Sequence, residues 1–96
     1  MLRTVNVLRH LSRHDGLTGV LNRRAFEEAL RDEWLRARRG GGAFSVVLLD
    51  LDHFKQVNDR FGHQAGDLAL AHAAQQLKAV ARGSDLVARY GGEEFA

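Results

Sequence analysis

Apolar residues recur along the chain at helical spacing, interrupted by short apolar runs that predict strands. Near the N-terminus an apolar residue falls at every third position, with arginines between, which predicts a helix over residues 1–13. The turn-rich segment 14–19 ends this helix. Asn22 is a suitable N-cap for a second helix that runs to about Arg38, where Gly40–Gly42 stops it. One face of that helix is apolar and is assigned to the core: Phe26, Ala29, Leu30, Trp34 and Ala37.

The middle of the chain predicts a buried strand followed by a short helix. The run from Phe44 to Leu51 is almost continuously apolar, which predicts a central strand covered at least in part on both faces. It ends abruptly at Asp50 and Asp52. A short helix is expected from Phe54 to about Phe61, with Gly62 as its stop.

The last third predicts a long helix and a hairpin. Asp67 can cap a helix that reaches about Ala81, with an apolar face formed by Leu70, Ala74, Leu77 and Ala81. Residues Leu86 to Tyr90 predict a second strand. Gly91-Gly92 is typical of a two-residue turn that needs positive φ, and Glu93 to Ala96 begins a returning strand.

Composition excludes several classes of function. The chain has 96 residues, 45% of them hydrophobic and 27% charged, which is typical of one small globular domain. A net charge of +2 is too small to favour nucleic acid as a partner. With no cysteine, disulfides and thiolate metal sites are excluded, and a cytoplasmic location is expected. No apolar run is long enough to cross a membrane.

Acidic residues gather at two predicted turns. Asp50 and Asp52 end the central strand, and Glu93-Glu94 follows the glycine pair. Carboxylates at a strand end favour a hard divalent cation such as Mg²⁺. Each of these patterns, taken alone, occurs more often as a solvated turn.

The segment between the acidic turns can bind a nucleotide. Where the chain passes from strand to helix at Phe54, unpaired amides and the charge of Lys55 can hold phosphate oxygens. Asn58 and Asp67 carry an amide and a carboxylate, which can read the edge of guanine. Helix capping explains the same two residues equally well.

Four sequence blocks together carry a family resemblance. They read DGLTGVLNRR at 15–24, DLDHFKQVND at 50–59, FGHQAGD at 61–67 and RYGGEEF at 89–95. In order and spacing the chain resembles the first half of the GGDEF domain of diguanylate cyclases, over about residues 10–96. The GGEEF form of the hairpin is an active variant within that family.

The resemblance implies an α+β fold with a central antiparallel sheet and flanking helices, related to nucleotide cyclases and polymerase palms. Residues 1–13 would form a linker or signalling helix, and 14–96 a partial domain. Each domain would bind one GTP, and a homodimer would join two GTP molecules into cyclic di-GMP and two pyrophosphates. A sensory or receiver domain is expected upstream.

The resemblance also implies roles for individual residues. Mg²⁺ or Mn²⁺, two ions in each half-site, would be held by Asp50, the Leu51 carbonyl, Glu93 and Glu94. Glu93 and Lys55 are the expected catalytic residues. Phe54 and Lys55 would lie against the triphosphate, and Asn58 and Asp67 would recognise guanine.

A second site is implied by an R-x-x-D motif. Arg82 and Asp85, with a further contact from Arg36, would bind the product cyclic di-GMP and inhibit the enzyme. The part of the domain after the hairpin is absent from the sequence, so we expect the chain alone to be inactive or nearly so and prone to aggregate through an apolar edge. Two alternatives are a remnant that binds GTP or cyclic di-GMP without turnover, and an interaction fragment whose N-terminal helix pairs with a partner.

Overall fold

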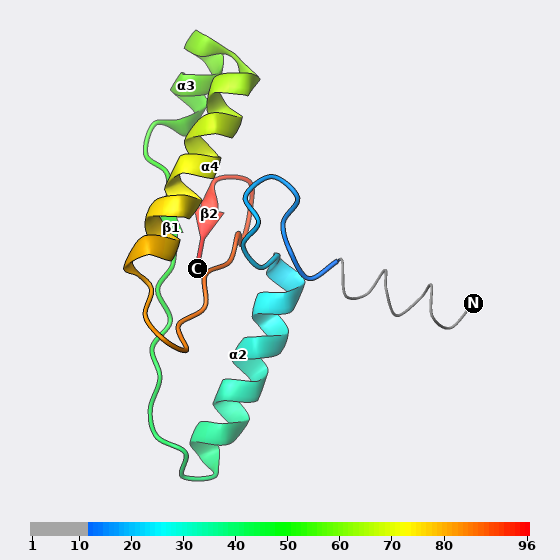
Figure 1. Ribbon diagram of the computed structural model, residues 1–96, viewed down its shortest axis with the longest axis vertical. Coiled ribbons are helices and arrows are strands. Elements are labelled where there is room, and N and C mark those ends of the chain that lie inside the picture. The colour runs from blue at the N-terminus through cyan, green and yellow to red at the C-terminus, as the bar shows by residue number, and fades with distance from the viewer. Residues whose placement is uncertain (1–11) are drawn as a thin grey trace, which may run out of the picture.

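Two packed helices at one end and a single helix at the other frame a short pair of strands (Figure 1). The computed structural model describes residues 12–96. The elements follow in the order α2 (Arg23–Arg38), β1 (Leu49–Asp50), α3 (Phe54–Phe61), α4 (His63–Val80) and β2 (Glu94–Phe95). The N-terminal helix expected over residues 1–13 lies almost wholly outside the described residues.

Helix α2 begins and ends where the sequence predicts. The side chain of Asn22 accepts a hydrogen bond from the Ala25 amide at 2.9 Å, which satisfies one of the open donors of the first turn. Beyond the last turn, Gly40 and Gly42 adopt φ values of +86° and +94° that favour glycine. The core assignment of Trp34 is wrong, because the residue is 51% exposed and its ring is covered by the Arg38 guanidinium at 4.8 Å.

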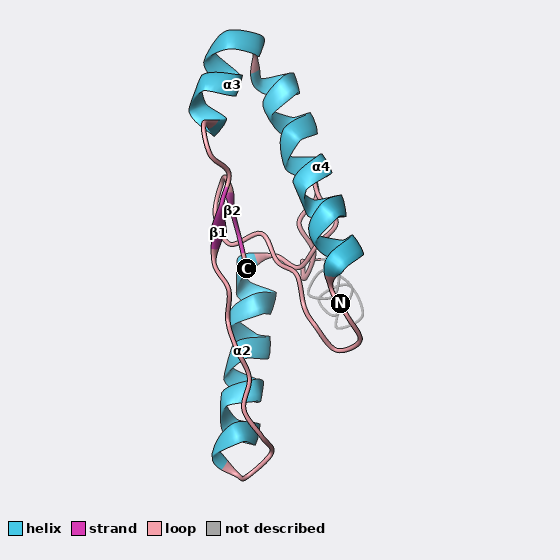
Figure 2. Cartoon of the chain, turned by 90° about the vertical axis from the view of Figure 1, so that its left-hand side faces the viewer, coloured by secondary structure: helices cyan, strands magenta, loops and turns pink. Residues whose placement is uncertain are grey.

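Helices α3 and α4 form a helical hairpin with Gly62 as its corner (Figure 2). Gly62 has a φ of +91°, which ends α3 and lets α4 begin at the next residue. The bounds of α3 are as predicted. Asp67 is not the cap of α4, since the helix starts four residues earlier and leaves Asp67 inside its second turn.

The strand pair is antiparallel, as expected, but much shorter. Leu49 lies opposite Phe95, and Asp50 lies opposite Glu94. The predicted strand over residues 44–51 is reduced to two residues, because 44–48 have no strand partner within residues 12–96. The expected cover on both faces is also wrong, since Val47 is 61% and Leu48 66% exposed.

The hairpin before β2 forms without the expected strand or turn conformation. In place of a strand over residues 86–90 there are single bridges, Ala88 to Leu21 and Arg89 to Phe95. The Tyr90 amide donates to the Glu94 carbonyl at 2.7 Å, so the loop has three residues, 91–93. Neither glycine of the loop has a positive φ, which corrects the prediction for the Gly91-Gly92 pair.

A small core joins α4 to the strands. Its buried members are Val20, Leu70, Ala74 and Phe95. The predicted apolar face of α4 is therefore confirmed at Leu70 and Ala74. Phe95, next to Glu94, is only 1% exposed, so burial of this ring fixes the strand that carries the acidic residue.

The fold is open rather than compact. The radius of gyration is 15.6 Å, against about 13 Å for a compact domain of about 100 residues. Within residues 12–96 no helix combines the length and apolar character needed to cross a membrane.

Candidate nucleotide and metal site

Two of the predicted metal ligands are direct neighbours across the strand pair. Asp50 and Glu94 are register partners. The Leu51 amide donates to the Glu93 carbonyl at 3.0 Å, which makes the adjacent Asp50–Glu94 pair the type whose side chains stand closest. Both residues are exposed, so both carboxylates are open to solvent and to a ligand.

The carboxylate of Glu94 lies against the hairpin loop. A Cβ atom at Gly91 would stand 2.2 Å from Glu94 Oε1, so only glycine leaves room for this side chain. Close approach, rather than an unusual φ, is the physical reason for glycine at this position. A larger residue would displace the Glu94 carboxylate from its place against the loop.

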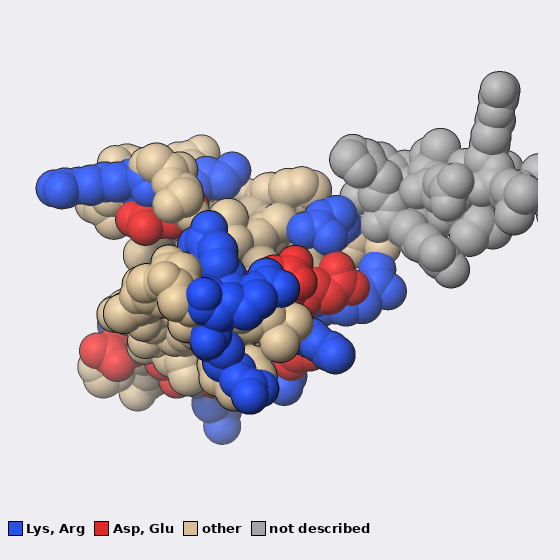
Figure 3. Space-filling model, turned by 90° about the horizontal axis from the view of Figure 1, so that it is seen from below, with Lys and Arg blue, Asp and Glu red and all other residues tan. Residues whose placement is uncertain are grey.

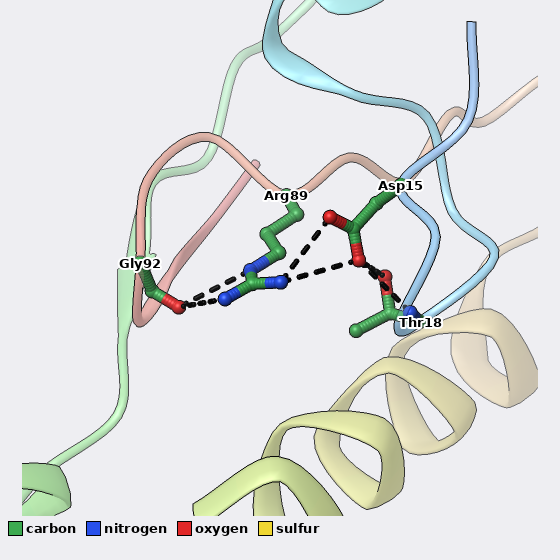
Figure 4. A network of polar contacts seen from close by, with 4 residues as sticks. All are labelled: Asp15, Thr18, Arg89 and Gly92. Atoms are coloured by element: carbon green, nitrogen blue, oxygen red, sulfur yellow. Dashed lines mark hydrogen bonds and ion pairs between the residues drawn. The ribbon is translucent and has the colours of Figure 1, made fainter. Parts of the chain in front are cut away.

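Arg89 fastens the same loop to the start of the described chain (Figure 4). Its Nε and Nη2 donate to the Gly92 carbonyl at 3.2 and 2.8 Å, and its Nη1 donates to both carboxylate oxygens of Asp15 at 3.2 and 3.3 Å. The planar guanidinium reaches two partners at once, which a lysine cannot do with the same geometry. The loop that carries Glu93 is thereby held from outside the hairpin.

The Asp15 carboxylate is also held by hydrogen bonds within its own turn, residues 15–18. Its Oδ2 accepts hydrogen bonds from the Thr18 amide at 2.9 Å and the Thr18 hydroxyl at 2.8 Å. Burial by itself would raise the pKa of Asp15, but the Thr18 hydrogen bonds and the Arg89 charge act in the opposite direction and leave the pKa below its ordinary value. Asp15 therefore stays ionised and keeps its pairing with Arg89 well into the acid range.

A polar pocket of about 270 Å³ lies between the helical hairpin of α3 and α4 and the β-hairpin loop 91–93, which carries Glu93. It brings together residues from α3, α4 and the hairpin: Phe54, Asn58, His63, Asp67, Leu70, Arg89, Gly92, Glu93 and Glu94. The predicted guanine-recognising residues thus share a cavity with two of the predicted metal ligands.

Neither Asn58 nor Asp67 serves as a helix N-cap. Asn58 lies inside α3 and Asp67 inside α4, and the caps of these helices are His53 and Gly62. Among residues 12–96, the Asn58 side-chain oxygen is buried with no hydrogen-bond partner. A buried polar atom without a partner is costly to the fold, so a ligand that supplies a donor would relieve it.

Asp50 and Glu94 together suit a Mg²⁺ ion that keeps water or phosphate ligands better than a metal whose ligands all come from the protein. No group of three His, Cys, Asp or Glu side chains placed to hold a metal exists in the part of the chain from 12 to 96. Mg²⁺ commonly uses one or two carboxylates and completes its octahedron with water and substrate phosphates. Asp50 and Glu94 supply such a pair, and the pocket beside them has room for a ligand.

Three predicted residues stand outside the lining of this pocket. Asp50 and Leu51 lie on the strand side, next to Glu94 and Glu93, and Lys55 is exposed on the first turn of α3. Asp50 and Leu51 therefore border the site through their strand partners instead of lining it. The first turn of α3 follows His53, whose φ is +61° and whose side chain makes no capping hydrogen bond.

The residues of the R-x-x-D motif form a separate, local structure. Asp85 accepts a hydrogen bond from the Arg82 amide at 3.0 Å, and its own amide donates to the Arg82 carbonyl at 2.7 Å. Both residues line a second pocket, of about 440 Å³, together with Lys78. The geometry therefore groups Arg82 and Asp85 on one tight turn.

Arg36 lies apart from that pocket. It is in the last turn of α2 and forms an ion pair with Glu33. Figure 3 looks onto the end of the molecule where α2 finishes and shows basic side chains gathered there. Arg36 and Asp85 instead share a largely apolar cavity of about 610 Å³ between α2, the segment 43–49 and the end of α4.

Sequence reasoning assigned no role to Arg89 or His63, which also line the polar pocket. Both were inside the recognised blocks, so their position in those blocks was the available signal. The contact of Arg89 with Asp15 spans 74 positions and leaves no trace in local periodicity.

The fold and the site define a class: α+β domains with acidic residues on a central antiparallel strand pair beside a polar pocket. The chain belongs to the GGDEF family, because the family described as "Diguanylate cyclase, GGDEF domain" matches it over residues 12–96. The resemblance inferred from the four blocks and the α+β class are both confirmed.

Two curated relatives carry the name of the enzyme. The chain is 45% identical over 89 residues to "Probable diguanylate cyclase DgcC" of Escherichia coli strain K12, which covers 93% of this chain and 24% of that protein. It is 49% identical over 81 residues to "Diguanylate cyclase DgcP" of Pseudomonas aeruginosa, which covers 84% of this chain and 12% of that protein. The chain therefore spans about a quarter or less of these relatives.

A solved structure shares the fold. The GGDEF domain of DgcB from Caulobacter crescentus, determined in complex with c-di-GMP, matches with a TM-score of 0.83 at 43% identity. The match covers 86% of this chain and 47% of that chain.

Proposed function

We propose that this chain is the GTP-binding portion of a diguanylate cyclase and supplies one half of the site that joins two GTP molecules into cyclic di-GMP. One observation carries the proposal. Asn58 and Asp67 share a pocket with Glu93 and Glu94, and Glu94 is the register partner of Asp50. The proposed base-reading residues and the proposed metal-binding residues would therefore act on the same bound nucleotide.

Guanine would occupy the end of the pocket between α3 and α4. The Asp67 carboxylate accepts hydrogen bonds from the N1–H and the 2-amino group, which adenine does not present in this arrangement. The amide of Asn58 pairs with other atoms of the base edge, and Phe54 contributes an apolar wall. A site that hydrogen-bonds its substrate rejects analogues that leave its buried polar groups unpaired.

The triphosphate would extend toward the acidic strand pair. Asp50, Glu94 and the Leu51 carbonyl would hold Mg²⁺ or Mn²⁺, and Glu93 would contribute to a second ion. Such an ion, when bound, neutralises charge on the phosphates and lowers the pKa of the attacking hydroxyl. Lys55 and the open amides at the start of α3 would lie along the phosphates.

The reaction requires two copies of the site. Each ribose 3′-oxygen forms a bond to the α-phosphorus of the other nucleotide, the bond to pyrophosphate breaks, and Glu93 accepts the hydroxyl proton. Within residues 12–96, the pocket that Asn58 and Asp67 share with Glu93 and Glu94 would hold one nucleotide, so a two-fold dimer would bring the second. A sensory or receiver domain upstream would control this pairing.

Product inhibition would use the Arg82–Asp85 turn. Its pocket of about 440 Å³ adds Lys78 to the two motif residues, which favours an anionic guanine dinucleotide. Arg36 would reach the ligand from α2, beside the cavity that it shares with Asp85. We expect Arg82→Ala to abolish cyclic di-GMP binding without changing GTP affinity, as measured by calorimetric titration of each nucleotide.

Calorimetric titration with a non-hydrolysable GTP analogue and Mg²⁺ tests the proposal on the chain as it stands. Binding should weaken in Asn58→Ala and in Asp67→Asn, and should be unchanged in Asp32→Asn, a control that neutralises an exposed carboxylate on α2. The matching ATP analogue should bind much more weakly. Equal affinity for the two analogues would refute guanine recognition by this pocket.

Turnover separates the enzyme from a binding remnant. We expect little cyclic di-GMP from GTP with this chain alone, because it spans about half of the DgcB domain. Binding without any product, with cyclic di-GMP held through Arg82, would favour the remnant. Robust synthesis would show that residues 1–96 suffice.

A further inference from the structure

Gly66 stands where α4 passes closest to α3. A Cβ atom at this position would lie 1.8 Å from the side-chain oxygen of Asn58, 2.9 Å from its Cγ and 3.3 Å from Cζ of Phe54. Carbon atoms do not approach other heavy atoms to less than about 3 Å without displacement. Any side chain at residue 66 would therefore collide with Asn58.

Backbone conformation does not explain this glycine. Gly66 lies inside the regular helix α4 and its φ is not positive. Glycine weakens a helix interior relative to alanine, so the local preference is for another residue. The remaining reason for glycine is the space that it leaves for Asn58.

That space holds the amide beside its proposed partner in recognition. Gly66 is buried, and Asp67 is the next residue along α4. Asn58 and Asp67 line the same pocket, and the Asn58 oxygen lacks a hydrogen-bond partner within residues 12–96. The Asn58 side-chain amide thus packs directly against the α-carbon of Gly66, in the space that a Cβ atom would occupy.

We propose that Gly66 determines nucleotide specificity by fixing the position of the Asn58 amide relative to the Asp67 carboxylate. The inference rests on the proposed function, since it assigns guanine to this pocket. The atom closest to the added methyl is the far end of a flexible side chain, so a methyl group at residue 66 swings Asn58 away while α3 and α4 remain in place. Gly66 acts through Asn58 as a positioning residue.

The test compares Gly66→Ala with wild type by calorimetry, using non-hydrolysable GTP and ATP analogues with Mg²⁺. We expect GTP-analogue affinity to fall about tenfold, the value for one lost hydrogen bond of about 1.4 kcal/mol. The preference for guanine over adenine should fall with it. Gly16→Ala is the matched control, because its methyl group meets no atom within 4 Å and affinity should not change.

A double variant shows whether Gly66→Ala weakens nucleotide binding through Asn58 or by disturbing the fold. In the Asn58→Ala background the collision with the Asn58 side chain is removed and the Phe54 ring remains at 3.3 Å, so Asn58→Ala/Gly66→Ala should bind the GTP analogue nearly as Asn58→Ala does. A tenfold loss from Gly66→Ala in both backgrounds would overturn the proposal. So would a Gly66→Ala chain that unfolds and is rescued by Asn58→Ala, because the methyl would then act on the fold.

A readout without nucleotide distinguishes failure of this inference from failure of the proposed function. The ¹H–¹⁵N signals of the Asn58 side-chain amide should shift in Gly66→Ala, while the backbone signals of residues in α2 stay in place. If wild type binds neither analogue, the proposed function fails. If the Asn58 signals do not move, the role of Gly66 fails, whatever the nucleotide result.

Discussion

Arg89 shows how one side chain ties an acidic loop to a distant turn. The guanidinium joins the Gly92 carbonyl to the Asp15 carboxylate, and both partners of the ion pair are only about one-fifth exposed. Shielding from solvent strengthens such a pair relative to the surface ion pairs elsewhere, among them Arg13–Glu28 and Arg23–Glu27. Arg89 therefore links the geometry of the candidate site to stability of the fold.

The lowered pKa of Asp15 predicts a pH-dependent contribution to stability. Because the folded-state pKa lies below the unfolded value of about 3.9, the charged carboxylate stabilises the fold above that value, and the contribution disappears as pH falls through the folded-state pKa. Asp15→Asn should cost about 1–2 kcal/mol of unfolding free energy at neutral pH. Urea unfolding at several pH values measures the difference.

The stability difference between wild type and Asp15→Asn should depend on pH in one direction. The gap between wild type and Asp15→Asn should be constant near neutral pH and shrink below about pH 4. The same series on Asp32→Asn, an exposed carboxylate, is the control. A gap that is unchanged at acid pH, or that widens there, would contradict the stabilising role of the Asp15 charge.

The chemical groups of the candidate site could be predicted from the sequence, whereas the tertiary contacts that position them could not. The acidic pairs and the two residues proposed to recognise guanine follow from residue type and from the four sequence blocks. The roles of Arg89, Gly66 and Gly91 could not be predicted, because each depends on an atom brought close by folding: Asp15, Asn58 and Glu94 respectively.

At the scale of the elements, the start of helix α2 depends on one residue, its N-cap Asn22. Asn22 caps the helix through its side-chain oxygen, while its Nδ2 donates to the Ser12 carbonyl and its amide to the Arg13 carbonyl at 2.8 Å. Asn22→Ala should lower the unfolding free energy by about 1 kcal/mol or somewhat more, since it removes the cap and the contact with Ser12. Asn22→Asp keeps the capping oxygen and should recover part of the loss. Equal losses in both variants, by chemical unfolding, would show that the cap contributes little.

The bounds of helices α2 and α3 were predictable, whereas the start of α4 and the extent of the strands were not. The bounds of α2 and α3 agree with the sequence expectation, because helical hydrogen bonds are local and the caps and stops lie within the same segment. Strands depend on partners elsewhere in the chain. Within residues 12–96, the strand formed by the apolar run from Phe44 to Leu51 is limited to Leu49 and Asp50, opposite β2, and the residues before it are exposed.

At the scale of the molecule, the exposed apolar segment 46–49 is a candidate site of self-association within residues 12–96. Val46, Val47, Leu48 and Leu49 are each at least 40% exposed and form a continuous run. A long apolar edge is a site for pairing with another chain. We therefore expect the isolated chain to self-associate with increasing concentration.

Charge placed on this segment should suppress association. The variant Val47→Lys/Leu48→Lys should shift the chain toward monomer in sedimentation velocity, with unfolding free energy changed by less than about 0.5 kcal/mol. The variant Gln75→Lys/Gln76→Lys adds the same charge at exposed positions of α4 and should leave association in place. An equal effect of both variants would assign the change to net charge instead of to the segment 46–49.

We propose that Asp50 and Glu94, which are partners across the strand pair, hold one divalent ion between them. Electron paramagnetic resonance of Mn²⁺, titrated into the chain with a GTP analogue, measures this directly. Asp50→Asn and Glu94→Gln should each weaken Mn²⁺ binding about tenfold or more, with little further loss in the double variant, whereas Asp52→Asn should bind as wild type does. Unchanged Mn²⁺ affinity in either single variant would contradict a shared ion at Asp50 and Glu94.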